Sequence, residues 1–126
     1  MRNILINNII LMFFLNSTPV FTQQVLPDDT KLLRLAEILG SLHYLRNLCS
    51  TPTTQWYDHM EALIEAEQPT SEQRAYLYEA FNRAYRAFSA NYHSCTHSAI
   101  EADQRYIKEG KALSENLLIH LKNSSL

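Results

Sequence analysis

The fold is decided by residues 32–49, whose sequence is LLRLAEILGSLHYLRNLC. Apolar residues recur there at alternating steps of three and four, the spacing that places side chains on one face of an α-helix. This spacing predicts a helix from about Asp29 to Leu48, which follows Pro27 and is capped by Asp28 or Asp29. Its buried stripe is expected to contain Leu32, Leu35, Ile38, Leu39, Leu42, Leu45 and Cys49.

Two more helices are predicted from the residues that start them. Thr51-Pro52 is typical of a helix start, because a proline at the first helical position lacks only an N–H that would stay unpaired anyway. Residues 70–73, Thr-Ser-Glu-Gln, match a capping box and predict a third helix over about 71–92. The second helix should bury Trp56, Met60, Leu63 and Ile64, and the third a seam of aromatic rings formed by Tyr78, Phe81, Tyr85, Phe88 and Tyr92.

A fourth helix is predicted after a cap at Thr96 or Ser98. Gly110 falls within its buried stripe, although glycine inside a helix costs about 1 kcal/mol relative to alanine. Close approach of another helix would explain this glycine, and a flexible point is the alternative. The other buried positions are expected to be Ala102, Tyr106, Leu113, Leu117 and Leu121.

Composition and connection lengths favour an all-α fold. The 126 residues include only 2 glycines, and helix formers dominate the sequence after the N-terminal segment. Short connections make successive helices antiparallel. We therefore predict a four-helix up-down-up-down bundle in which Cys49 and Cys95 meet at one end and form a disulfide.

The N-terminus is typical of a secretory signal. Arg2 precedes an apolar run over residues 9–15, and Val20-Phe21-Thr22 supplies small residues for cleavage. The expected organisation is a signal peptide over residues 1–22, a short flexible lead over 23–28, a helical domain over 29–122 and a frayed tail over 123–126. The run is too short and too interrupted for a membrane span. Export to an oxidising compartment agrees with an even number of cysteines.

Charge gives no reason to expect nucleic acid as a partner. Removal of the signal peptide removes Arg2, so 10 Lys and Arg face 13 Asp and Glu, a net charge of 10 − 13 = −3.

The end of the bundle that holds the cysteines is expected to gather a polar cluster of His43, Arg46, Trp56, Tyr92 and Asp103. Arg46 lies on the apolar arc of the first helix, and a buried guanidinium needs a partner. Asp103 is the best-placed carboxylate. The cluster is either a ligand pocket with a stacking tryptophan or a structural ion pair whose arginine stem packs along the core.

No catalytic or metal-binding pattern is present. The sequence lacks the nucleophile, phosphate-loop and zinc-protease motifs, so we expect no enzyme activity, no cofactor and no metal. His93 and His97 flank Cys95, but a helix end is predicted between them and zinc needs three or four ligands. Function is instead expected at the solvent-exposed faces of the second and third helices, where the candidate partner face consists of Glu61, Glu65, Arg83 and Arg86. Glu79 and Arg83 are expected to form an ion pair along the third helix.

Two blocks of sequence resemble a known family. They are LRLAEILGSLHYLRNLC at residues 33–49 and AFNRAYRAF at residues 80–88, the latter followed by Tyr92 and Cys95-Thr96. They are similar to an uncharacterised family of small exported alphaproteobacterial proteins with a two-cysteine core, over roughly Leu32 to Leu121. The resemblance implies a periplasmic location and a role in growth or maintenance of the cell envelope. It supplies no activity to transfer.

Three functions fit these observations. The first is a soluble, non-enzymatic periplasmic protein that binds another envelope protein. The second is a periplasmic chaperone of the acid-stress type, since histidines and carboxylates respond to pH. The third is a binder of a small ligand at the end of the bundle near Arg46, Trp56 and Tyr92.

Overall fold

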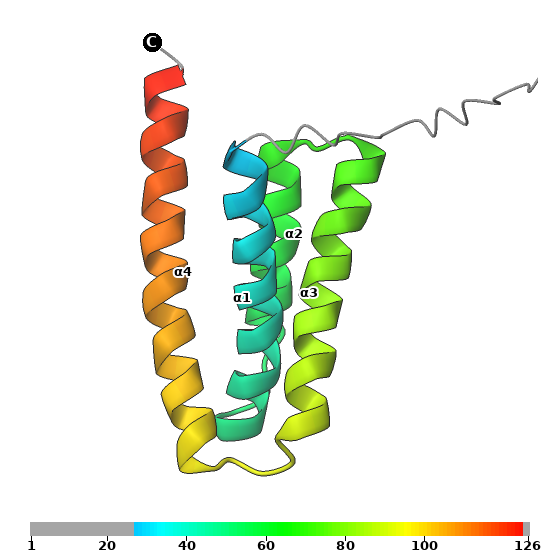
Figure 1. Cartoon of the computed structure of the whole chain (residues 1–126), viewed down its shortest axis with the longest axis vertical. Helices are drawn as coiled ribbons and strands as arrows, with labels where there is room; N and C mark the ends of the chain where they lie inside the picture. Colours follow the sequence, from blue (N-terminus) through cyan, green and yellow to red (C-terminus); the bar gives the residue numbers. More distant parts are fainter. Residues whose placement is uncertain (1–26, 125–126) are drawn as a thin grey trace, which may run out of the picture.

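The protein is a bundle of four helices that alternate in direction along the chain (Figure 1). The computed structural model describes residues 27–124, and side chains within residues 30–117. The helices are α1 (Pro27–Cys49), α2 (Gln55–Glu67), α3 (Ser71–Asn91) and α4 (His97–Ser124), and no strand occurs in this range. The predicted all-α bundle is confirmed. The proposed signal peptide, residues 1–22, lies outside the described residues.

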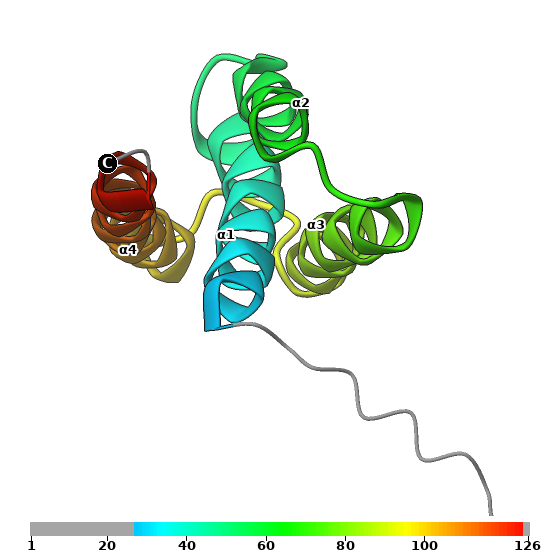
Figure 2. The ribbon, with the colours of Figure 1, turned by 90° about the horizontal axis from the view of Figure 1, so that it is seen from above.

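The helix α1 is the centre of the molecule. Seen from above, it lies between the other three helices (Figure 2), and it packs against each of them. The predicted apolar stripe is buried except for Cys49, which is partly buried. Ala36, Gly40 and Ser41, on other sides of the helix, are buried as well. The hydroxyl of Ser41 donates a hydrogen bond of 2.8 Å to the backbone carbonyl of Glu37, so this buried hydroxyl has a partner.

The two glycines lie where helices approach closely. A Cβ at Gly40 would lie 2.8 Å from the carbonyl carbon of Phe81 and 3.0 Å from its Cα, so α1 and α3 touch backbone to backbone. A Cβ at Gly110 would meet only the Cγ2 of Ile38, at 3.2 Å. The predicted close approach of another helix at Gly110 is thus present, and the contact is made by the side chain of Ile38 on α1. The tighter one at Gly40 was not predicted.

Two of the predicted helix starts are confirmed. Thr70 and Gln73 form the capping box: the Thr70 hydroxyl accepts from the Gln73 N–H at 3.2 Å, and the Gln73 side chain accepts from the Thr70 N–H at 3.0 Å. At the start of α4, the hydroxyl of Thr96 accepts from the N–H of Ala99 at 3.2 Å.

The predicted start of α2 at Thr51-Pro52 is wrong, because the helix begins at Gln55. The side chain of Asn47 accepts from the N–H of Thr53 at 2.7 Å, and the Thr53 hydroxyl accepts from the N–H of Gln55 at 3.1 Å. These bonds hold residues 50–54 in a connection. The outer bounds of the bundle differ by two residues from the expected 29–122, since α1 includes Pro27 and Asp28 and α4 extends to Ser124.

A disulfide joins Cys49 and Cys95, whose Cα atoms are 5.0 Å apart. Cys49 is the last residue of α1, and Cys95 lies in the connection between α3 and α4. The bridge therefore fixes the lower end of the central helix to the turn that joins its two neighbours. Leu45, Ala99 and Ala102 pack beside it as a small second core.

Candidate functional site

The helices α2, α3 and α4 surround α1, so the molecule has three faces, each between two neighbouring outer helices (Figure 2). One face lies between α3 and α4, a second between α2 and α4, and a third between α2 and α3. The residues of the predicted polar cluster are divided among them.

Arg46 and Asp103 form the predicted ion pair, between α1 and α4. The Nε of Arg46 and the Oδ1 of Asp103 are 2.8 Å apart, although neither atom is aligned for a hydrogen bond. The guanidinium also lies 5.9 Å from the centre of the Trp56 ring on α2. The Arg46 side chain is 35% exposed and that of Asp103 is 13% exposed, so the arginine is less buried than expected.

His43 lies on a different side of α1, among aromatic rings of α2 and α3. Its ring centre is 5.5 Å from that of Tyr85, 5.8 Å from Phe81 and 6.3 Å from Tyr57. Its Nδ1 is buried and has no hydrogen-bond partner among the described residues. Burial lowers the pKa of His43, an effect that the negative charge of Asp58 partly opposes.

Tyr92 occupies the third side. Its ring stacks on Phe88 at 5.9 Å, and its backbone carbonyl accepts a hydrogen bond from the hydroxyl of Tyr44. The predicted cluster is therefore brought together only in part: Arg46, Asp103 and Trp56 meet. His43 and Tyr92 lie on other sides of α1. His43 and Arg46 are only three residues apart, but a central helix presents neighbouring positions to different helices.

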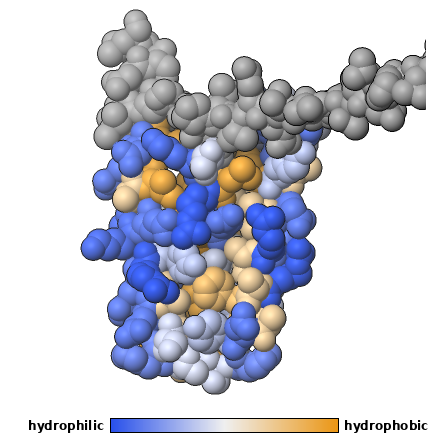
Figure 3. Space-filling model, in the orientation of Figure 1, coloured by the Kyte–Doolittle hydropathy of each residue, from blue (hydrophilic) through white to orange (hydrophobic). Residues whose placement is uncertain are grey.

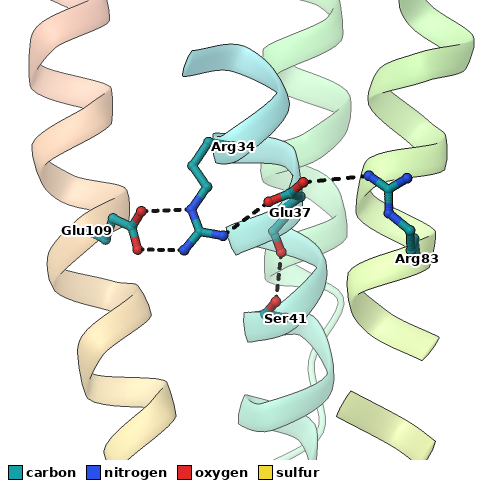
Figure 4. A network of polar contacts seen from close by, with 5 residues as sticks. All are labelled: Arg34, Glu37, Ser41, Arg83 and Glu109. Carbon is teal, nitrogen blue, oxygen red and sulfur yellow. Dashed lines mark hydrogen bonds and ion pairs between the residues drawn. The ribbon is translucent and has the colours of Figure 1, made fainter. Parts of the chain in front are cut away.

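A network of charges across α1 was missed by sequence reasoning (Figure 4). The guanidinium of Arg34 donates to both carboxylate oxygens of Glu109 on α4, at 2.7 and 3.0 Å, and to Glu37 at 3.1 Å. Glu37 also lies 3.6 Å from Arg83 on α3. These contacts raise the pKa of Arg34, chiefly through Glu109, and the bond from Arg34 lowers the pKa of Glu109.

This network makes the α3–α4 face a structural seam. It links three helices through partly exposed charges, and Tyr106 lies beneath the Arg34 guanidinium at 5.5 Å. On this side of the molecule hydrophilic side chains predominate, and apolar ones show between them as separate patches (Figure 3). The sequence signal was Arg34 itself, a cation within an apolar stretch, but its partner is 75 residues away.

The face between α2 and α4 is a groove of about 590 Å³ with an apolar floor, called here the α2–α4 groove. Its floor comes from α1, where Leu35, Ile38, Leu39 and Leu42 are almost fully covered. Its walls are formed by Trp56, His59, Ala62 and Leu63 of α2 and by Ile107, Gly110, Lys111, Ser114 and Glu115 of α4. A volume of this size is within the range of small-molecule sites.

The candidate partner face is divided between two sides of the molecule. Glu61 and Glu65 line a hollow of about 450 Å³ between α2 and α3, together with Ile64, Gln68, Pro69, Arg74 and Tyr78. Arg83 instead faces Glu37 of α1, and Arg86 pairs with Glu79 at 3.2 Å. The expected pairing of Glu79 with Arg83 is therefore wrong, because Glu37 attracts Arg83 across the helix interface.

The two histidines near Cys95 are not brought together with other ligands. His97 lies 3.0 Å from Glu101 on the exposed first turn of α4. Within the described residues, no three His, Cys, Asp or Glu side chains are grouped as a metal site would require. No described helix is both long and apolar enough to cross a membrane.

Comparison with known proteins identifies a family. A family model described as "Protein of unknown function (DUF2385)" matches residues 27–120, which is nearly the whole bundle. The chain belongs to this family. No curated protein and no solved structure matches the chain. The family has no described function, so a function has to be argued from the faces of the bundle.

Proposed function

We propose that this protein is an exported, non-enzymatic accessory factor that binds another protein of the cell envelope through α2. The N-terminal segment, residues 1–22, supports export, and the disulfide between Cys49 and Cys95 suits the oxidising periplasm. Growth or maintenance of the envelope of an alphaproteobacterium is the process that the sequence resemblance implies.

One observation carries the binding role: α2 is bordered by a hollow on each side. The α2–α4 groove lies on one flank and the hollow with Glu61 and Glu65 on the other, while only its inner face packs on α1. A short helix that presents two flanks and an outer surface is suited to recognition of a partner. The disulfide and the Arg34 network hold the other three helices as a rigid support.

Site-specific crosslinking in living cells tests this role. A photoreactive residue replaces Ala62 or Glu65 on α2, and matched controls replace Ala90 on α3 or Arg105 on α4; all four positions are exposed. Crosslinks to one defined envelope protein from α2 alone are expected. Equal crosslinking from the control positions contradicts a role for α2. Cell fractionation and the mass of the mature N-terminus test export, with Gln23 as the expected first residue.

A small-ligand binder is the second candidate, because the α2–α4 groove has the volume and the apolar floor of a ligand site. Trp56, the only tryptophan of the chain, lies in its wall and makes fluorescence a direct probe. Native mass spectrometry of protein purified from the periplasm would reveal a retained ligand. The chaperone alternative is tested separately, by suppression of client aggregation at low pH.

A further inference from the structure

Most described carboxylates of α1, α3 and α4 lie at ion-pair distance from a basic side chain, whereas those of α2 do not. In α1, α3 and α4, five acidic side chains lie at ion-pair distance from a basic side chain. Glu37, Glu79, Asp103 and Glu109 pair with arginine, and Glu101 lies beside His97, which is charged only when protonated. Among residues 30–117 of those helices, only Glu72 and Glu115 do not lie at ion-pair distance from a basic side chain. Among the described residues, none of the four acidic residues of α2 (Asp58, Glu61, Glu65 and Glu67) lies at ion-pair distance from a basic side chain, and α2 contains no Lys or Arg. The helix therefore carries negative charge that no Lys or Arg of its own balances.

Part of this charge lies beside exposed aromatic rings on the α3 side of α2. Glu61 and Glu65 line the hollow. Tyr57 precedes Glu61 by four residues on α2, so the two side chains are neighbours on one face of the helix, and the charge of Glu61 is the main cause of a raised pKa at the Tyr57 hydroxyl. Tyr57 is 39% exposed and Tyr85, across the aromatic group on α3, is 36% exposed. Rings of this kind attract cations through their faces.

The protein itself already places one cation on a ring in this hollow. The guanidinium of Arg74 lies 5.6 Å from the centre of the Tyr78 ring, and Arg74 is the only basic residue among those that line the hollow. Glu61 and Glu65 leave a net negative charge after Arg74 is counted. The chemistry of the surface is therefore that of a receptor for further positive charge.

We propose that the α2–α3 face, defined as Tyr57, Glu61, Glu65 and Tyr78, binds a lysine- or arginine-containing segment of the partner protein. This inference rests on the proposed function and specifies the partner's chemistry. Nucleic acid and anionic lipid are repelled by the same charges. The α2–α4 groove is less suited to a basic segment, because its floor is apolar and the charge of Glu115 on its wall is accompanied by that of Lys111.

The proposal is tested by adding synthetic octalysine to the whole isotope-labelled mature chain and recording its amide chemical shifts. Shifts should concentrate on α2 and the facing side of α3 and should weaken as salt rises, because screening weakens exposed charge pairs. The double variant Glu61→Gln, Glu65→Gln should lower the affinity about fivefold, the loss expected for two exposed ion pairs. Tyr57→Phe keeps the ring and should bind normally, whereas Tyr57→Leu should bind more weakly.

The matched control is Glu72→Gln with Glu101→Gln, which removes the same charge from exposed positions on α3 and α4. Equal weakening in the control would show unspecific attraction and overturn the proposal, as would shifts centred on the α2–α4 groove or no binding at all. The outcome of the crosslinking experiment is independent. A partner captured through α2 at a segment without basic residues would leave the proposed function standing and refute this inference.

Discussion

Replacement of Gly40 by alanine should destabilise the protein strongly, against the preference of helices for alanine. The added Cβ would meet the backbone of Phe81, at 2.8 Å from its carbonyl carbon and 3.0 Å from its Cα. Ordinary van der Waals contacts lie at 3.4–4 Å. Backbone atoms cannot rotate away as a side chain can, so α1 and α3 would have to separate.

The magnitude follows from two opposing effects. Alanine gains about 1 kcal/mol over glycine in the interior of a helix. Overpacking a tight interface typically costs about 1–3 kcal/mol, and more when backbones collide. Separation would also loosen the packing of Leu77, Ala80 and Phe81 on α1. We expect a net loss of about 2 kcal/mol, which lowers the Tm of a domain of this size by roughly 8–16 °C.

Gly110→Ala is the matched control, since the same substitution meets only the Cγ2 of Ile38, at 3.2 Å. A methyl group can move by a few tenths of an ångström, so the helix preference should prevail and leave stability unchanged or raised by up to about 1 kcal/mol. Thermal and urea unfolding of both variants measure the difference. A Gly40→Ala protein as stable as the wild type would refute the backbone contact between α1 and α3.

Three further predictions concern the covalent link, an ion pair and a histidine. Replacing Cys49 and Cys95 by serine should lower the free energy of unfolding in urea by ~4 kcal/mol, because the disulfide closes a loop with a sequence separation of 46. A loss below about 1 kcal/mol would contradict this loop-entropy estimate. Arg46→Ala should lower the free energy of unfolding by about 1–2 kcal/mol, less than the loss of a fully buried pair, because the Arg46 side chain is 35% exposed. A smaller loss in an Asp103→Asn background would show that the ion pair is responsible. His43 has a lowered pKa in the folded state, so the unfolded chain binds its proton first as the pH falls. Its contribution to stability is therefore full above about pH 6.5 and is lost as the pH falls through the lowered pKa, and His43→Gln should reduce the drop in Tm between about pH 7 and 5.

Local features of the fold could be predicted because each depends on residues near one another in the chain. The capping box of Thr70 and Gln73 involves neighbours three apart, and the helical stripe of α1 follows from its own periodicity. The same local reasoning failed at Thr51-Pro52, where the side chain of Asn47 competes for the N–H of Thr53 and delays the helix.

The candidate site was less predictable, because it depends on which helix lies beside which. The sequence indicated that Arg46 needs a carboxylate, and Asp103 supplies it. It did not indicate that His43, one turn away, contacts the rings of α2 and α3 instead. Glu61 and Glu65 were selected for exposure, whereas the property that distinguishes them is their place in the hollow between α2 and α3, beside Tyr78.

By itself, the sequence determined the all-α class, the alternating direction of four helices and the pairing of Cys49 with Cys95, since periodicity, short connections and an even number of cysteines are properties of the chain alone. Only the tertiary structure decided that α1 is central, because the pattern of one helix does not tell how many neighbours enclose it. The same holds for the Arg34 network and the charge left on α2. An ion pair depends on distances in space, and helices that are far apart in sequence bring those charges together or keep them apart.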